Sequence, residues 1–176
     1  TGLYPVFLHF GTLPSPKVQE GVSYTQLVDL SHFWVDGEVN GSGLYNKFVL
    51  TENVKDSVRD TAYGKYDYVV LDTTFSSKDD LNARRESLGF DSQERLYEET
   101  TAYAYASSIE YNTNWVLGAD GKVTYQDGSI VNGNGSCIFF HCQSGNATAG
   151  CISIPEADYK TFLETVDQYG ALIAIN

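Results

Sequence analysis

The residues whose types and spacing could carry chemistry lie in the stretch His141–Cys151, which reads HCQSGNATAGC. An imidazole in an apolar run is followed ten positions later by a thiol, across a loop of small residues. Cysteine acyl transfer needs a thiolate, a base within hydrogen-bonding reach and donors facing the developing oxyanion. Ala147–Gly150 would let backbone N–H groups approach a substrate carbonyl closely. A helix predicted to begin near Pro155 could also support the thiolate with its positive end.

Two simpler interpretations of these residues stay open beside the catalytic one. A cysteine and a histidine at this spacing also occur by chance, and buried cysteines are commonly structural. A zinc site is less favoured, because His141 and Cys142 are adjacent and neighbouring strand residues point to opposite faces. We expect Cys142 to be a packed core thiol and no metal to be bound. His9 and His32 are expected to be ordinary surface or packed histidines.

Strands outnumber helices among the elements that would position this pair. Pro5 indicates that the first strand is an edge strand or that it starts there. The segment His32–Leu50 is interpreted as a structured loop flanked by short extended pieces, and Trp115–Val131 carries the Asp-Gly signals of a hairpin. The predicted strands are Tyr4–Phe10, Tyr66–Asp72, Tyr103–Tyr111, Ser136–Cys142 and Ala171–Ile175.

Three helices are predicted. Ser77 is expected to cap a helix through Arg85 with Gly89 beyond its end, and Ser92–Glu98 is expected to form a second, short one. The third begins with Pro155 and stops at Gly170. Its apolar face repeats at helical spacing and comprises Tyr159, Phe162, Leu163 and Val166.

Length and charge limit the classes of protein. The chain of 176 residues fits one domain, 1–176, that is mainly β with a few short helices. Acidic residues outnumber basic ones by 23 to 11, and the net charge of −12 argues against nucleic acid and against an anionic membrane surface. No stretch reaches the roughly 20 apolar residues of a membrane span. Because the chain starts at Thr1 and has no Met, we expect a processed product.

Two motifs, GSCIFFH at Gly135–His141 and TAGCISIP at Thr148–Pro155, resemble the L,D-transpeptidase catalytic domain of the YkuD type. They are most similar to the branch whose nucleophile loop reads TAGC. The segments HFWVDGEVNGSGLYN at His32–Asn46 and IEYNT at Ile109–Thr113 are also similar to that branch. Thr1-Gly2 resembles the end of a further family motif, which implies that the first family strands lie upstream and are absent here.

The resemblance implies a β-sandwich-like fold and a cysteine acyltransferase that acts on peptidoglycan stem peptides. Cys151 matches the family nucleophile, and His141 matches the base. Thr148, Ala149 and Gly150 match the nucleophile loop, in which the N–H groups of Gly150 and Cys151 would be the oxyanion donors. No metal or organic cofactor is implied.

Four further residues fall in family-like segments and are candidates for a substrate groove: Trp34, Tyr45, Tyr111 and Asn112. Aromatic residues packed in a β core are the alternative interpretation. The chain departs from the broader family in having Cys142 after the histidine, and in having Ser153 where an arginine follows the nucleophile.

The resemblance further predicts a monomer in the bacterial cell envelope, exported after removal of an upstream signal or domain. The implied partners are peptidoglycan stem peptides, with no nucleic acid and no membrane span in this chain. The alternative is a non-catalytic cell-wall-binding or structural domain of a bacterial surface protein.

Overall fold

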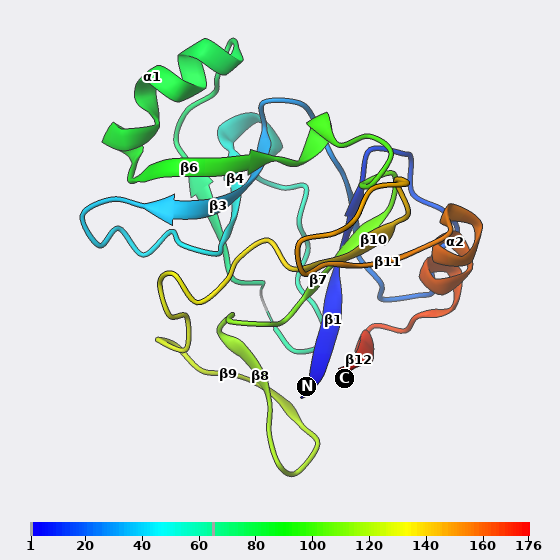
Figure 1. Cartoon of the computed structure of the whole chain (residues 1–176). Helices are drawn as coiled ribbons and strands as arrows, with labels where there is room; N and C mark the ends of the chain where they lie inside the picture. The colour runs from blue at the N-terminus through cyan, green and yellow to red at the C-terminus, as the bar shows by residue number, and fades with distance from the viewer. Residues whose placement is uncertain (1, 65) are drawn as a thin grey trace.

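The computed structural model describes residues 2–64 and 66–176, so Thr1 lies outside the described residues. Strands predominate, which confirms the prediction of a mainly β protein. They form a six-stranded sheet, a four-stranded sheet and a hairpin, with one helix at each side of the molecule (Figure 1). No helix in the described chain combines the length and apolar character needed to cross a bilayer.

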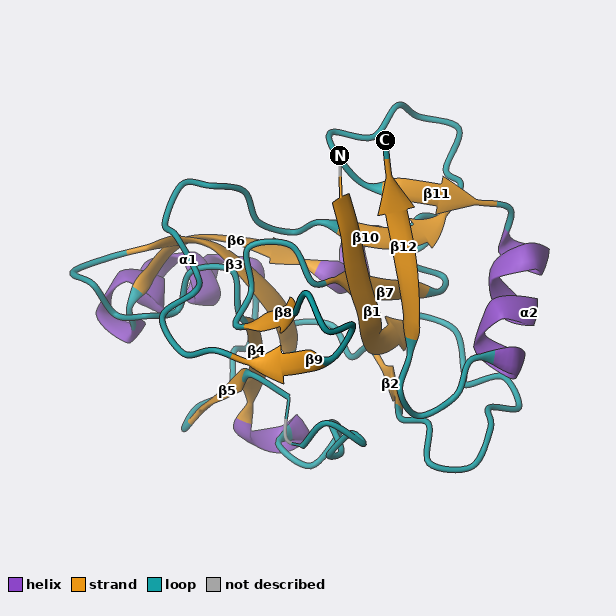
Figure 2. Cartoon of the chain, turned by 90° about the horizontal axis from the view of Figure 1, so that it is seen from below, coloured by secondary structure: helices purple, strands orange, loops and turns teal. Residues whose placement is uncertain are grey.

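The six-stranded sheet has the order β11-β10-β7-β1-β12, and β2 pairs with β1 beyond the end of β12. The pairs β10–β11 and β1–β2 are parallel, while the others are antiparallel. Figure 2 shows β1 and β12 side by side, with both chain ends at the same edge. The strands of this six-stranded sheet are β1 (Gly2–Gly11), β2 (Tyr24–Gln26), β7 (Ala106–Ile109), β10 (Phe139–Cys142), β11 (Ile152–Ile154) and β12 (Ala171–Ile175).

The four-stranded sheet has the order β5-β4-β3-β6, with β4 and β5 parallel. The predicted hairpin forms from β8 and β9 around the turn at Asp120-Gly121. Two short 3-10 helices, at Glu52–Val54 and Leu96–Glu98, follow β4 and β6. The strands are β3 (His32–Glu38), β4 (Phe48–Thr51), β5 (Tyr68–Leu71), β6 (Phe90–Arg95), β8 (Trp115–Leu117) and β9 (Val123–Tyr125).

Aromatic side chains join the two larger sheets into one core. Phe10 of β1 stacks on Phe48 of β4 with ring centroids 6.1 Å apart. Trp34 of β3 meets Phe139 of β10 edge-on at 5.0 Å. Because these rings come from both sheets, the core fixes β3 and β4 against the face of the six-stranded sheet that carries Phe139.

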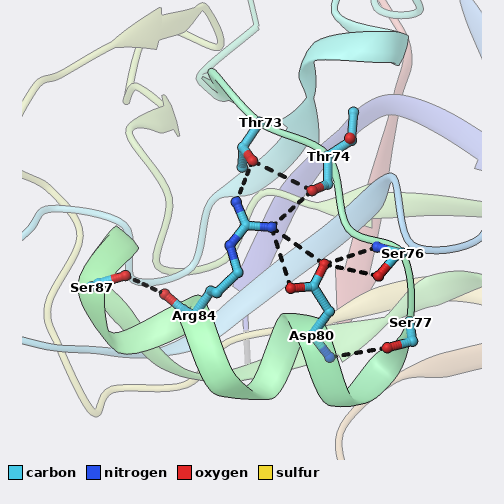
Figure 3. A network of polar contacts seen from close by, with 7 residues as sticks. All are labelled: Thr73, Thr74, Ser76, Ser77, Asp80, Arg84 and Ser87. Atoms are coloured by element: carbon cyan, nitrogen blue, oxygen red, sulfur yellow. Dashed lines mark hydrogen bonds and ion pairs between the residues drawn. The ribbon is translucent and has the colours of Figure 1, made fainter.

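Helix α1 (Lys78–Leu88) forms as its capping residues predict, although it runs three residues past Arg85. The Ser77 side chain accepts a hydrogen bond from the Asp80 N–H, and Gly89 ends the helix in the left-handed conformation at φ 107°. Figure 3 shows Arg84 reaching from the helix to the preceding segment, where it donates to Thr73 and to the Thr74 carbonyl.

Helix α2 (Glu156–Thr165) packs its predicted apolar face on β10, where Tyr159 contacts the Phe140 ring at 4.7 Å. Its predicted ends are wrong. Pro155 precedes the helix as its N-cap, and the helix ends where Val166 turns extended. Gly170, at φ 73°, instead closes the turn that leads into β12.

Three further predictions of secondary structure are corrected. Ser92–Glu98 is mostly strand β6, not helix, because its residues pair with β3. Pro5 lies inside β1, which is central between β7 and β12 and not an edge. By contrast, His32–Leu50 is a loop flanked by extended pieces, as predicted, with β3 before the loop and β4 after it. The strand predicted from Ser136 begins only at Phe139, because Cys137 has a positive φ of 54°.

Candidate active site

The pairing of β10 with β11 brings His141 and Cys151 to one face of the six-stranded sheet. Phe140 pairs with Ile152, and His141 pairs with Ser153. When this parallel register is extended by one residue toward the start of both strands, Cys151 lies beside Phe139. The Phe139 N–H donates to Cys151 Sγ over 3.4 Å. Residues two apart on a strand share a face, so the side chains of Phe139 and His141 both point into the core. The Tyr103 ring packs against both, at 5.5 and 5.6 Å.

The His141 imidazole is held by backbone. Its ring is buried, and Nδ1 lies 2.7 Å from the carbonyl oxygen of Cys142. A carbonyl can only accept a hydrogen bond, so Nδ1 is the N–H donor and Nε2 of the neutral ring keeps a free lone pair. This arrangement leaves Nε2 able to accept a proton.

The Cys151 thiol is held in a protonated form. Sγ donates to the Cys137 carbonyl over 3.3 Å. Burial raises the pKa of Cys151, and the Glu94 carboxylate adds to the rise, whereas the Phe139 N–H lowers it. Within residues 2–64 and 66–176, Sγ forms no hydrogen bond to His141. Nucleophilic attack would therefore require the thiol to leave the Cys137 carbonyl and approach Nε2.

The loop before Cys151 is exposed and is shaped by its own residues. Thr148 Oγ1 donates to the Cys151 carbonyl over 2.6 Å, which closes the loop. Gly150 has a φ of 115°, a conformation that side chains rarely adopt. Among the described residues, no partner within the chain accepts from the N–H groups of Gly150 and Cys151, so both could bind an oxyanion. Ala149 is exposed between them and Thr148.

The positive end of α2 does not face Cys151, which corrects the expectation that it supports the thiolate. Strand β11 separates the two, and the start of the helix lies beside Cys142 instead. Burial, together with the nearby Glu156 carboxylate, raises the pKa of Cys142 to about 11. Cys142 packs against Tyr159, which confirms the prediction of a core thiol.

Sequence reasoning missed a second group of polar residues at the thiol. Glu94 of β6 accepts a hydrogen bond from the Tyr103 hydroxyl, and burial raises the pKa of the carboxyl group. Burial and Glu94 also raise the pKa of Cys137. Glu94 comes from the segment predicted to be helical and from the other sheet, so no local signal pointed to it.

Asn46 is a further residue that the predicted site left out. Its Oδ1 accepts from Trp34 Nε1 at 2.7 Å and from the Cys137 N–H at 3.3 Å. Its Nδ2 donates to the Asn112 carbonyl at 2.8 Å. Asn46 therefore ties β3 to the segment that carries the acceptor of the Cys151 thiol. The signal for it lay in the family-like segment His32–Asn46, of which it is the last residue.

The four groove candidates do not line one groove. Trp34 is buried in the core, with its indole on Asn46. Tyr45 lines a cavity of about 210 Å³, whereas Tyr111 and Asn112 line a different hollow of about 310 Å³. Asn112 also binds the segment before β10, because its Nδ2 donates to the carbonyls of residues 131 and 135. His141 and Cys151 line neither hollow.

His9 and His32 are packed side chains and not surface histidines. Both are buried, and burial lowers the pKa of each to about 4. His9 Nδ1 lies 2.7 Å from the Ser107 hydroxyl, and His32 Nε2 lies 2.9 Å from that of Ser57. In the part of the chain that the structure describes, no three His, Cys, Asp or Glu side chains are grouped as metal ligands would be.

Comparison with known proteins gives no relative. The chain matches no family model, no curated protein and no solved structure. The functional interpretation of the site therefore depends on its residues and their geometry.

Proposed function

We propose that this protein is a cysteine acyltransferase of the L,D-transpeptidase type, with the corresponding β-sandwich-like fold, that acts on peptidoglycan stem peptides in the bacterial cell envelope. One observation carries the proposal. Paired strands bring His141 and Cys151 to the same face of a sheet, and a backbone carbonyl orients the imidazole so that Nε2 can accept a proton. Both residues also stand in the two motifs that resemble this family.

In the proposed reaction, Nε2 of His141 takes the proton from Cys151 Sγ as the thiol leaves the Cys137 carbonyl. The thiolate attacks the carbonyl carbon of the third stem residue, and the unpaired N–H groups of Gly150 and Cys151 stabilise the oxyanion. The imidazolium then protonates the leaving amine, which departs as the terminal D-amino acid and leaves a thioester. A side-chain amine or water attacks the thioester, which gives a cross-link or a trimmed peptide and restores the thiol.

The test measures release of D-alanine from a stem tetrapeptide and the intact mass of the protein after exposure to a carbapenem. The parent should release D-alanine and gain one carbapenem mass, whereas Cys151→Ala should do neither. Cys142→Ala is the matched control, since that thiol faces the other side of β10 and should leave both results unchanged. Absence of product and of adduct in a folded parent would overturn the proposal.

A non-catalytic wall-binding domain is the second candidate, and the state of the thiol favours it. Burial and Glu94 raise the pKa of Cys151, which opposes the thiolate that catalysis needs. This candidate predicts that the parent binds isolated peptidoglycan without turnover. It also predicts that alkylation of Cys151 shows an apparent pKa above the ordinary thiol value and no change in His141→Ala.

A further inference from the structure

An open hollow of about 340 Å³ lies away from the Cys151 site, beside the β8–β9 hairpin at the lower edge of the molecule in Figure 1. Its lining is almost entirely aromatic, with one acidic residue. Trp115 of β8 is buried, while Tyr125 of β9 is 47% exposed. The residues that line it are Tyr63, Tyr66, Asp67, Trp115 and Tyr125.

The rings of this aromatic hollow stand at angles to one another. Tyr125 meets Trp115 at 5.4 Å with an interplanar angle of 72°, and Tyr63 meets it at 6.0 Å with an angle of 47°. Rings whose centroids lie this close together are in direct contact, so no group fits between them. The ring surface open to a group in the hollow comes from the exposed Tyr125 and the part-buried Tyr63, which pack against Trp115.

Acidic groups dominate the charge around the aromatic hollow. Asp67 belongs to its lining, and the carboxylates of Asp127 and Asp167 are close enough to act on the Tyr125 and Tyr63 hydroxyls respectively. Among the described basic residues, Lys47 is the one that contacts this group, through an ion pair of 3.5 Å with Asp67. Among the described residues around the hollow, the three carboxylates therefore outnumber the one ammonium group, and the whole chain carries a net charge of −12.

We propose that the aromatic hollow is a binding site for an organic ammonium ion, with a quaternary ammonium group as the best fit. The negative faces of the aromatic rings attract a cation within about 6 Å of a ring centroid, and methyl groups on nitrogen spread the charge over a rounded apolar surface. Asp67 and the outer carboxylates add long-range attraction. The site is independent of Cys151 and His141, so it stands whether or not the protein is an acyltransferase.

The test is a titration with choline, followed by proton–nitrogen correlation NMR of the two tryptophan indole N–H groups. The Trp115 resonance should shift with saturation, whereas that of Trp34 should stay in place, because Trp34 is buried in the core and donates to Asn46. Dimethylbutanol, the uncharged carbon analogue of choline, is the matched ligand control. Tyr125→Leu should weaken choline binding about 5- to 30-fold. Tyr97→Leu, at a tyrosine 38% exposed elsewhere, should not weaken it.

Each outcome decides the proposal. An unmoved Trp34 resonance in Tyr125→Leu would show that the variant is folded, so that weaker binding reports on the hollow. Equal affinity for choline and dimethylbutanol would overturn the proposal, because the hollow would then bind apolar groups regardless of charge. A shift of the Trp115 resonance with chito-oligosaccharide but not with choline would overturn it in favour of a carbohydrate site. No shift with any of these ligands would overturn it as well.

Discussion

Replacing Asn46 with alanine should cost about 3–5 kcal/mol of unfolding free energy, a large share of the stability of a domain of this size. The side chain is 4% exposed and makes four hydrogen bonds. Alanine would leave the buried Trp34 N–H and the part-buried Cys137 N–H without an acceptor, at about 1–3 kcal/mol each. Asn46 also has a φ of 54°, which asparagine tolerates better than alanine by about 1 kcal/mol. Urea unfolding monitored by tryptophan fluorescence measures the change.

A double-mutant cycle tests the reasoning behind that number. Trp34→Phe removes the Nε1 donor and keeps a ring in the core, with Trp115 as the remaining fluorophore. If Asn46 acts through Trp34, the two changes together should cost about 1 kcal/mol less than the sum of their separate costs. Asn132→Ala, at an exposed residue that donates to Glu38, should change stability by less than about 0.5 kcal/mol. A loss below about 1 kcal/mol for Asn46→Ala would refute the argument.

Three further substitutions have defined outcomes. Burial raises the pKa of Glu110 to about 7, so the folded state keeps a proton that the unfolded state loses, and stability should fall as pH rises from about 4.5 to 7. Glu110→Gln should therefore add about 2–3 kcal/mol above pH 7 and little near pH 4, by urea unfolding at each pH. Gly170→Ala should cost more than about 2 kcal/mol in thermal unfolding, because φ is 73° and a Cβ would lie 2.2 Å from the Val6 carbonyl oxygen. Thr148→Val should lower kcat/KM for a stem tetrapeptide about tenfold, since it removes the hydrogen bond to the Cys151 carbonyl.

These three substitutions have matched controls. A pH-independent effect of Glu110→Gln would contradict burial as the cause of its shifted pKa. Gly145 has a φ of 82° with open space around it, so Gly145→Ala should cost only the backbone strain of about 1 kcal/mol. Equal losses at Gly145 and Gly170 would refute the steric argument. Thr161→Val, on the exposed side of α2, should leave kcat/KM unchanged, and an equal fall there would remove the special role of Thr148.

The elements that could be predicted are those whose signals are local. Helix α1 follows from a capping serine, acidic residues in its first turn and a glycine after its last, all within one short segment. The segment Ser92–Glu98 has no such local determinant. It lies at the edge of the four-stranded sheet, and only pairing with distant β3 makes it a strand. The prediction that Gly170 ends α2 was wrong for a similar reason, because the left-handed conformation of Gly170 forms the turn before β12.

The residues of the candidate site also differ in whether the local sequence could predict them. Cys151 and His141 could be proposed from the sequence because each lies in one of the two family-like motifs, only ten positions apart. Glu94 and Tyr103 reach the thiol from elsewhere in the chain, and only the packing of two sheets brings them together. The position of Trp34 was ambiguous, because an aromatic residue on a strand suits a core and a groove equally well.

The pairing of β1 with β12 sets the order in which the chain can fold. Gly2 lies opposite Ile175, and Val6 lies opposite Ala171, so the contacts of the sheet span nearly the whole sequence. During synthesis, the Gly2–Val6 part of β1 must wait for β12 before its backbone groups on that side find hydrogen-bond partners. Closing so long a loop is costly in entropy, and proteins dominated by such contacts fold in milliseconds to seconds. We therefore expect slow refolding that depends on residues 171–175, and aggregation of nascent chains that stop before them.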